Sequence, residues 1–487
     1  MRLPLPHSHD LVLGTRGPFN FFRLHLPMHS RATHTYVIGI TGKGKSKLLE
    51  HLLFEDIVAG RGCGLVDPHA DLADDLLCYL ASHPKKASAH WERIVYFDPS
   101  RTDTVIPFNV LSSGATPYQT AVNIVEAMRR TWPRTLEEAP RFANIVLVAL
   151  LTLIHNKLTL VEMPQLLTNP SYRHELCQNL SDPELRSFWQ DRYERWGREQ
   201  PLMIESVLNK ITCFTLNPTL RLILGASENC LDFRKLIDEG KVLIADLGRC
   251  DGETRRLLGS LLVIGIEQAA LSRKNEPTRR RLPFYFYLDE FQQFVANEGS
   301  ATTLSQILSE ARKFGLHLTL AHQTLGQMTS DYLRAALGNI QTKIIFGVDR
   351  EDAEVLAKKL FTTSGEEIKH TVADANQQER SHPLFYSLPE QWEKAIQQIQ
   401  NLPARWALVK TPEHHVVRMR TLTVHDRQCS DAKLLEIKRA LAQKVGRARE
   451  AVETEITRRR TVRNHQAHLI SSSKVIFRER VRRDISP

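Results

Sequence analysis

The stretch TYVIGITGKGKS, residues 35–46, decides how the rest of the chain is interpreted. It satisfies the pattern Gly-x-x-x-x-Gly-Lys-Ser/Thr, with Gly39, Gly44, Lys45 and Ser46 at the fixed positions. An apolar run of β type precedes the glycines, and leucines at helical spacing follow them. A strand, a glycine-rich turn and a helix in this order predict a phosphate-binding loop, because backbone N–H groups and a helix N-terminus hold phosphate oxygens.

The pattern assigns expected roles to the residues of the loop. Lys45 is expected to contact the β- and γ-phosphates of ATP, and Ser46 is expected to hold Mg²⁺. A chance match in an unrelated loop is the alternative, and the flanking strand and helix disfavour it. The expected nucleotide-binding residues are Gly39, Ile40, Thr41, Gly42, Lys43, Gly44, Lys45, Ser46 and Lys47.

A second motif, LPFYFYLDEFQQF at residues 282–294, supplies an acidic pair. The run before Asp289 and Glu290 is apolar on both faces, which is typical of a central strand that ends where α/β sheets bind ligands. We expect Asp289 to hold the Mg²⁺ shell and Glu290 to polarise the attacking water as the catalytic base. The alternative is an exposed acidic pair after an ordinary core strand.

A third motif, SEARKFGLHLTLAHQ at residues 309–323, predicts a helix that ends at Gly315 and a strand that Gln323 closes. In ATPases with an extra strand between the phosphate-loop strand and the acidic strand, a polar residue at this place senses the γ-phosphate. Arg312, on the preceding helix, is a candidate arginine finger for the nucleotide of a neighbouring subunit. The alternatives are an ordinary strand-end amide for Gln323 and a cation facing the helix dipole for Arg312.

Taken together, the motifs resemble those of the HerA–FtsK superfamily of P-loop ATPases, and within it the type IV secretion coupling proteins of the TraD/TraG kind. The resemblance extends from about residue 34 to residue 361. It implies an α/β, RecA-like sheet flanked by helices, with an inserted all-α domain, to which the sequence pattern adds a basic C-terminal helical tail. It also implies a ring-shaped hexamer that moves DNA through a central channel, with ATP and Mg²⁺ bound between subunits. The segments that carry it are HTYVIGITGKGKS, GCGLVDPHADLADDLL, GKVLIADLG, FYFYLDEFQQF, SEARKFGLHLTLAHQ and LGNIQTKIIFGVDREDAEVLAKKLF.

Three features depart from this family. Coupling proteins usually carry N-terminal transmembrane helices, and no such stretch is recognisable here. The family's DPHGD appears as DPHAD, with Ala70 in place of glycine, and Lys43 stands where a small residue is commoner. Asp67, at the end of the strand before Ala70, is expected either to orient Mg²⁺ or water, or to cap the following helix.

Composition shifts divide the chain into five expected segments. The C-terminal residues 431–487 contain 15 Lys and Arg against 7 Asp and Glu, so most of the net charge of +10 lies there. The segments are a short β-rich entry (1–33), the first part of the ATPase domain with the phosphate loop (34–115), an inserted all-α domain (116–229), the second part of the ATPase domain with the acidic pair and Gln323 (230–425), and a basic helical, partly mobile tail (426–487).

Cysteine usage and hydropathy predict the compartment. The seven cysteines are odd in number and form no Cys-x-x-Cys pair, which predicts a reducing environment with neither disulfides nor a zinc site. The longest apolar stretch, residues 145–154, is too short to cross a bilayer. We therefore expect a cytoplasmic protein without membrane insertion of its own, which a partner would hold at the membrane if it lies there at all.

The expected function is an ATP hydrolase that translocates DNA through a homo-oligomeric, hexameric ring and hydrolyses ATP at subunit interfaces. The expected partners are DNA and either a relaxosome, a secretion channel or a nuclease. Two other functions would use the same ATPase domain. One is an ATPase that moves or remodels protein cargo in a secretion system, and the other is a nucleotide-gated switch in a defence assembly. A small-molecule kinase fits poorly, because the acidic pair lies far beyond the loop and no lid is recognisable.

Overall fold

The computed structural model describes residues 10–112, 114–132, 140–295, 308, 310–328, 331–363, 367–373, 381–413 and 415–459. The chain divides into two compact units, which we describe separately. The first unit comprises Met1–Asp67, Asp71–Trp91 and Thr278–Cys429, and the second comprises Pro68–Ala70, Glu92–Pro277 and Ser430–Pro487. Residues 92–115 and 230–277, which the sequence assigns to the ATPase domain, thus share a unit with the helical segment.

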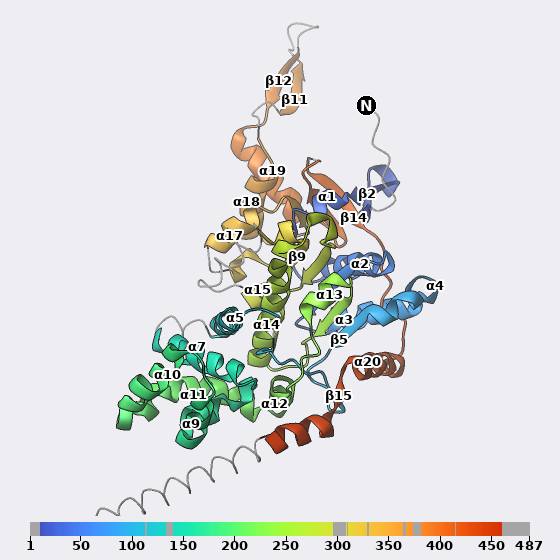
Figure 1. Cartoon of the computed structure of the whole chain (residues 1–487). Coiled ribbons are helices and arrows are strands. Elements are labelled where there is room, and N and C mark those ends of the chain that lie inside the picture. Colours follow the sequence, from blue (N-terminus) through green and yellow to red (C-terminus); the bar gives the residue numbers. More distant parts are fainter. Residues whose placement is uncertain are drawn as a thin grey trace, which may run out of the picture. The chain divides into compact units, whose positions relative to one another are not determined.

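The first unit is built on a mixed sheet in the order β2-β1-β14-β13-β10-β3-β9-β8-β4. The strands from β10 to β4 run parallel, and β13, β14, β1 and β2 continue the sheet in antiparallel fashion. Figure 1 shows β14, in orange, beside the N-terminal strands in blue. The strand bounds are β1 (Leu11–Arg16), β2 (Phe22–Leu26), β3 (Thr35–Ile38), β4 (Gly62–Asp67), β8 (Phe284–Leu288), β9 (Leu316–His322), β10 (Thr342–Ile345), β13 (Trp406–Lys410) and β14 (Val417–Thr421).

The parallel strands lie in the core of the first unit. Every residue of β3, β4 and β8 is buried, as expected for strands covered on both faces. The apolar face of α2 (Lys45–Val58) is buried as well, and α2 packs against α3 (Asp71–Ser82), which lies beside it in Figure 1. A separate hairpin, formed by β11 (Ile368–Ala373) and β12 (Ser381–Phe385), extends beyond α19 (Leu388–Gln400). The other labelled helices in the described part of this unit are α1 (Met28–Arg31), α4 (Pro84–Ala87), α15 (Gln292–Val295), α17 (Asp331–Gly338) and α18 (Arg350–Leu360).

A buried ion pair joins three elements of the first unit. Both terminal nitrogens of Arg31, at the end of α1, donate to the Asp56 carboxylate of α2 at 2.7 Å. The Tyr287 hydroxyl of β8 donates to the same carboxylate at 2.6 Å, and the Tyr285 ring lies 3.7 Å from the Arg31 guanidinium. Burial opposes ionisation of Asp56, yet Arg31 and Tyr287 hold the pKa of this carboxyl below its ordinary value.

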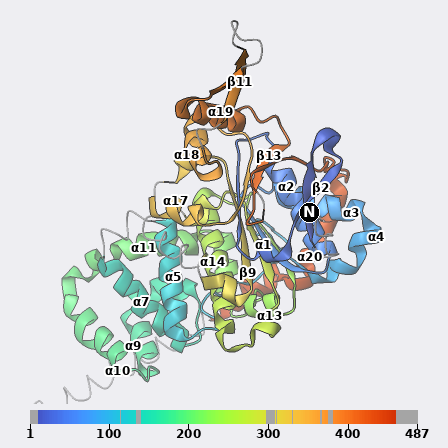
Figure 2. The same ribbon diagram turned by 90° about the horizontal axis from the view of Figure 1, so that it is seen from above.

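The second unit holds a parallel strand pair and most of the helices. β5 (Ile94–Phe97) pairs in parallel with β7 (Val242–Asp246). Figure 2 shows α5, α7, α9, α10 and α11 gathered in one helical group. Trp189 of this group is 1% exposed and donates to Thr152, so it serves the core. The labelled helices among its described residues are α5 (Pro117–Thr131), α7 (Pro140–His155), α8 (Met163–Thr168), α9 (Pro170–Gln178), α10 (Pro183–Ser187), α11 (Gln200–Leu216), α12 (Pro218–Gly225), α13 (Phe233–Asp238), α14 (Gly252–Leu271) and α20 (Asp431–Val445).

Two sequence-based expectations are wrong. The pattern LLEIKRALAQKVGRAREAVETEI, residues 434–456, predicts one helix, but α20 ends before Gly446, and a second helix begins at residue 449 after β15 (Arg447–Ala448) pairs with β6 (Thr104–Val105). A Cβ at Gly446 would lie 2.5 Å from the Thr104 side chain, so a close tertiary approach ends the helix there. The mobile end predicted for the tail lies outside the described residues.

The second wrong expectation concerns the cysteines. Cys78 of α3 and Cys429 form a disulfide, with Cα atoms 5.4 Å apart. The two residues are 351 positions apart, so only the tertiary fold brings them together.

Among the described residues, no single helix is long and apolar enough to cross a bilayer. Phe142–His155 with Leu160–Thr168 meets the length and hydropathy required only as a pair of helices bent by 119°.

Candidate nucleotide site

The phosphate loop lies between the end of β3 and the start of α2. Gly42 and Gly44 have φ values of 80° and 105°, a left-handed conformation that glycine adopts without steric cost. Gly44 is the N-cap of α2 and offers no side-chain acceptor, so the first N–H groups of the helix are left to a ligand. A Cβ at Gly39 would lie 2.5 Å from Phe346 Cβ, which explains the glycine at the start of the loop.

The register of the parallel strands brings the third motif to the loop. Ile38 of β3 pairs with His322 of β9, so Gln323 follows directly beside the loop. Leu288 of β8 pairs with Leu320 of the same strand. Parallel strands share one carboxyl edge, and the acidic pair therefore ends up at the loop as well.

Lys45 and the acidic pair are in direct contact. The Lys45 Nζ atom lies 2.5 Å from Glu290 Oε1 and 3.5 Å from Asp289 Oδ1, and all three side chains are buried. Burial opposes ionisation of Glu290, yet Lys45 and hydrogen bonds from Gln292 and Gln323 hold the pKa of this carboxyl below its ordinary value. Glu290 also has a φ of 44°, an unfavourable conformation that proteins retain chiefly at functional positions.

Gln323 connects the loop with the acidic pair. Its Oε1 accepts a hydrogen bond from the Thr41 hydroxyl at 3.2 Å, and its side chain is also hydrogen-bonded to Glu290. Gln292 donates to the other carboxylate oxygen of Glu290 at 2.7 Å. Because Gln323 contacts both the loop and the Glu290 carboxylate, a change in the conformation of the loop can alter the hydrogen bonding of that carboxylate.

His322 is a neighbour of the site that the sequence did not reveal. Its Nε2 lies 2.5 Å from the Tyr36 hydroxyl of β3, and its Nδ1 lies 3.0 Å from the Thr324 carbonyl. Burial, with Lys45 nearby, lowers the pKa of His322 to about 4, so the ring is neutral near pH 7. This residue ties β9 to β3 at the point where Gln323 begins.

Two lysines of the expected binding set turn to protein partners. Lys43 Nζ donates to the Leu402 carbonyl at 2.9 Å, and the Lys43 carbonyl accepts from the Arg405 N–H at 2.8 Å. Lys47 Nζ lies 2.8 Å from an Asp75 oxygen and 2.9 Å from a Glu50 oxygen. The turn that contains Leu402 and Arg405 therefore braces the loop, and no sequence motif marks this turn.

The other expected residues occupy different surroundings. Ser46 is exposed in the first turn of α2, near where a loop-bound metal ion would be expected. Asp67 accepts from the Ala73 N–H at 2.9 Å, which is a contact with the start of α3. In the second unit, Ala70 has a φ of 71°, which accounts for the glycine that the family's motif has at this place.

Arg312 lies far from the loop of its own chain. It is exposed on a 3₁₀ helix (Ala311–Phe314) before β9, whereas Gln323 follows the opposite end of that strand. β9 has 7 residues, so about 20 Å separates the two positions. The structure thus brings together Lys45, Asp289, Glu290, Thr41 and Gln323, and keeps Arg312 apart.

Comparison with known proteins agrees with this fold. Residues 283–402 match the family described as the TraM recognition site of TraD and TraG, a segment that contains the acidic pair, Arg312 and Gln323. No curated protein matches the sequence.

Solved structures extend the likeness over most of the chain. The unbound conjugative coupling protein TrwB is 18% identical, with a TM-score of 0.55, over 83% of this chain and 89% of that one. TrwB with ADP and Mg²⁺ is 17% identical, with a TM-score of 0.54, over 88% and 98%. VirB4 of Thermoanaerobacter pseudethanolicus is 12% identical, with a TM-score of 0.51, over 86% and 98%. The expected α/β, RecA-like fold and the likeness to coupling proteins are confirmed.

Proposed function

We propose that this chain, which has the fold of the conjugative coupling proteins, is an ATP-hydrolysing motor that translocates DNA through a ring of identical subunits. The observation that carries this proposal is the contact between Lys45 and Glu290, at 2.5 Å, inside that fold. A lysine that binds phosphate and a carboxylate that acts on water are two of the parts that P-loop ATP hydrolysis uses, and the positions of Lys45 and Glu290 support these roles.

The site fits a nucleotide triphosphate with Mg²⁺. The left-handed glycines and the uncapped N-terminus of α2 would hold the phosphates, and Ser46 and Asp289 would hold the metal ion. Bound Mg²⁺ neutralises phosphate charge in such reactions. TrwB has been solved with ADP and Mg²⁺ and with non-hydrolysable analogues of GTP and ATP, which supports the choice of ligand.

The Lys45 contact suggests how nucleotide binding activates the base. Lys45 is one of the groups that hold the pKa of Glu290 low. When Lys45 turns to the phosphates, Glu290 loses this partner and becomes more basic, which favours proton acceptance from water. Gln323, bonded to both Thr41 and Glu290, would couple the state of the loop to the carboxylate.

Ring assembly and DNA binding rest on broader observations. Arg312 lies at the far end of β9, so it would serve the site of a neighbouring subunit, in a hexamer if this chain assembles as the family does. The basic tail offers sequence-independent contacts with phosphates. The match to a TraM recognition site supports a relaxosome partner.

ATP turnover with and without DNA tests this proposal. We would measure hydrolysis by the full chain alone, with single-stranded DNA and with double-stranded DNA. Glu290→Gln serves as the blank, and Glu351→Gln, an exposed substitution on α18, serves as the control. Stimulation by one DNA form, lost in high salt, supports the motor. Turnover that neither DNA form changes would refute it and favour protein cargo or a nucleotide switch.

A further inference from the structure

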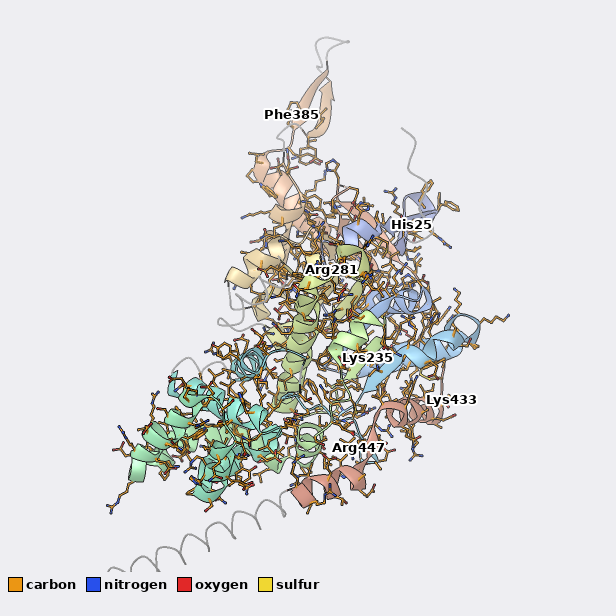
Figure 3. All side chains as sticks on the ribbon, viewed as in Figure 1. His25, Lys235, Arg281, Phe385, Lys433 and Arg447 are labelled. Carbon is orange, nitrogen blue, oxygen red and sulfur yellow. A yellow bond between two sulfur atoms is a disulfide. The ribbon has the colours of Figure 1, made fainter. Side chains whose placement is uncertain are left out.

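The turn of the β1–β2 hairpin exposes three phenylalanines. Phe19, Phe21 and Phe22 are 88%, 78% and 62% exposed. Isolated exposed apolar residues are ordinary, but three within four positions form a patch that a binding surface would explain. Figure 3 labels His25, which marks β2 of this hairpin.

The backbone of the turn holds the rings outward. Gly17, Phe19 and Asn20 have φ values of 80°, 55° and 58°. A left-handed conformation is unfavourable for a bulky residue such as Phe19, and such strain is retained mainly where it serves a function. The Asn20 N–H donates to the Gly17 carbonyl at 3.1 Å, and the rings of Phe19 and Phe21 meet edge to face at 6.0 Å.

Positive charge lies at the base of this aromatic tip. In the hairpin register, Arg16 pairs with Phe22, and Thr15 pairs with Arg23. The two arginines thus lie on adjacent strands in successive residue pairs along the hairpin, and Arg23 is exposed. The sequence from residue 11 to residue 49 contains no Asp or Glu. Aromatic rings beyond a level of arginines match the order of a bilayer surface, in which anionic headgroups lie above the acyl chains.

We propose that this hairpin tip inserts into the surface of an anionic membrane, with Phe19, Phe21 and Phe22 among the acyl chains and Arg16 and Arg23 on lipid phosphates. The rings are exposed on a turn between two strands, and the positive charge beside them complements acidic lipid. The contact is peripheral and requires no spanning helix. It goes beyond the proposed motor and does not depend on ATP hydrolysis.

Vesicle flotation of the full chain tests this proposal. The probes are vesicles of phosphatidylglycerol with phosphatidylethanolamine, and vesicles of phosphatidylcholine alone. The test variant is Phe19→Asn with Phe21→Ser and Phe22→Thr, which keeps the charge and suits the left-handed and strand positions. Because the basic tail also attracts anionic vesicles, this charge-neutral variant is the decisive one. We expect its partition coefficient to fall at least about tenfold.

Matched controls separate the tip from other surfaces. Tyr118→Ser removes a ring that is 62% exposed on α5 in the second unit, and should leave partitioning unchanged. Arg16→Gln with Arg23→Gln should reduce binding to anionic vesicles by roughly fivefold per arginine, and more than Arg279→Gln with Arg280→Gln does.

Equal flotation of the wild type and the phenylalanine variant would overturn the proposal. If the variant's sedimentation velocity or ATP turnover changes at the same time, the tip is instead a contact between copies of this chain. Loss of flotation with unchanged turnover supports the membrane contact even if the motor proposal fails.

Discussion

Lys45 Nζ lies 2.5 Å from Glu290 Oε1, although the two residues are 245 positions apart. This ion pair joins the helix that follows the phosphate loop to the end of the central strand β8. Both side chains are buried, so water does little to stabilise their charges and each charge depends on the other. Under the proposed function, the pair makes nucleotide binding and the charge state of Glu290 mutually dependent.

The first prediction concerns this pair. Glu290→Gln should bind ATP but lower turnover by about 10²- to 10⁴-fold, because the proton acceptor is lost. Lys45→Met should weaken ATP binding and also raise the pKa of Glu290, because an opposing positive charge is removed. Calorimetric titration with a non-hydrolysable analogue measures binding, and carboxyl NMR titration measures the pKa. An unchanged Glu290 pKa in Lys45→Met would contradict the proposed coupling.

A second prediction addresses Gln323. Gln323→Ala should reduce turnover by roughly tenfold to a hundredfold with little loss of ATP affinity, because it removes a bridge rather than a phosphate contact. Gln292→Ala is the matched control, since it removes a hydrogen bond to Glu290 but leaves the loop untouched. Equal losses in the two variants would mean that Gln323 acts only by supporting the carboxylate.

The strands and motifs of this site are predictable because their signals are local. The apolar run before Asp289 and the glycines before Lys45 each identify an element without knowledge of the rest of the fold. The bracing of Lys43 by Leu402, the pairing of Cys78 with Cys429 and the helix break at Gly446 depend on residues far away in the sequence. Such contacts leave no periodic pattern, so sequence inspection misses them.

Lys43 provides the third prediction. The sequence places it among the nucleotide ligands, but its amine donates to the Leu402 carbonyl. Lys43→Met should therefore lower ATP affinity only about tenfold, because the loop loses one hydrogen bond from a charged group but keeps its phosphate contacts. Lys45→Met should lower ATP affinity much more than Lys43→Met does. Equilibrium binding of a fluorescent ATP analogue would show this difference, and comparable losses would return Lys43 to the phosphate site.

The fourth prediction concerns stability. Asp56→Asn should lower the free energy of unfolding by about 3–5 kcal/mol, because Arg31 is left buried without its counterion. The folded-state pKa of Asp56 lies below its ordinary value of 3.8. Its contribution to stability is therefore complete above that value and is lost as the pH falls through the lower folded-state pKa. Urea unfolding of both proteins at neutral and acidic pH measures this. A difference between them that does not shrink in acid would contradict the assignment.

The fifth prediction concerns Arg312, which lies about 20 Å along β9 from the site of its own chain. If it acts on a neighbouring subunit, Arg312→Ala should lower turnover about 10³-fold, while Arg350→Ala, another exposed arginine, should not. Mixing Arg312→Ala with Glu290→Gln subunits should then restore part of the turnover, because some interfaces combine an intact Glu290 with an intact Arg312. Mass photometry of differently tagged subunits would verify co-assembly. Co-assembled rings that stay inactive would rule out a role in trans and leave Arg312 as a surface cation.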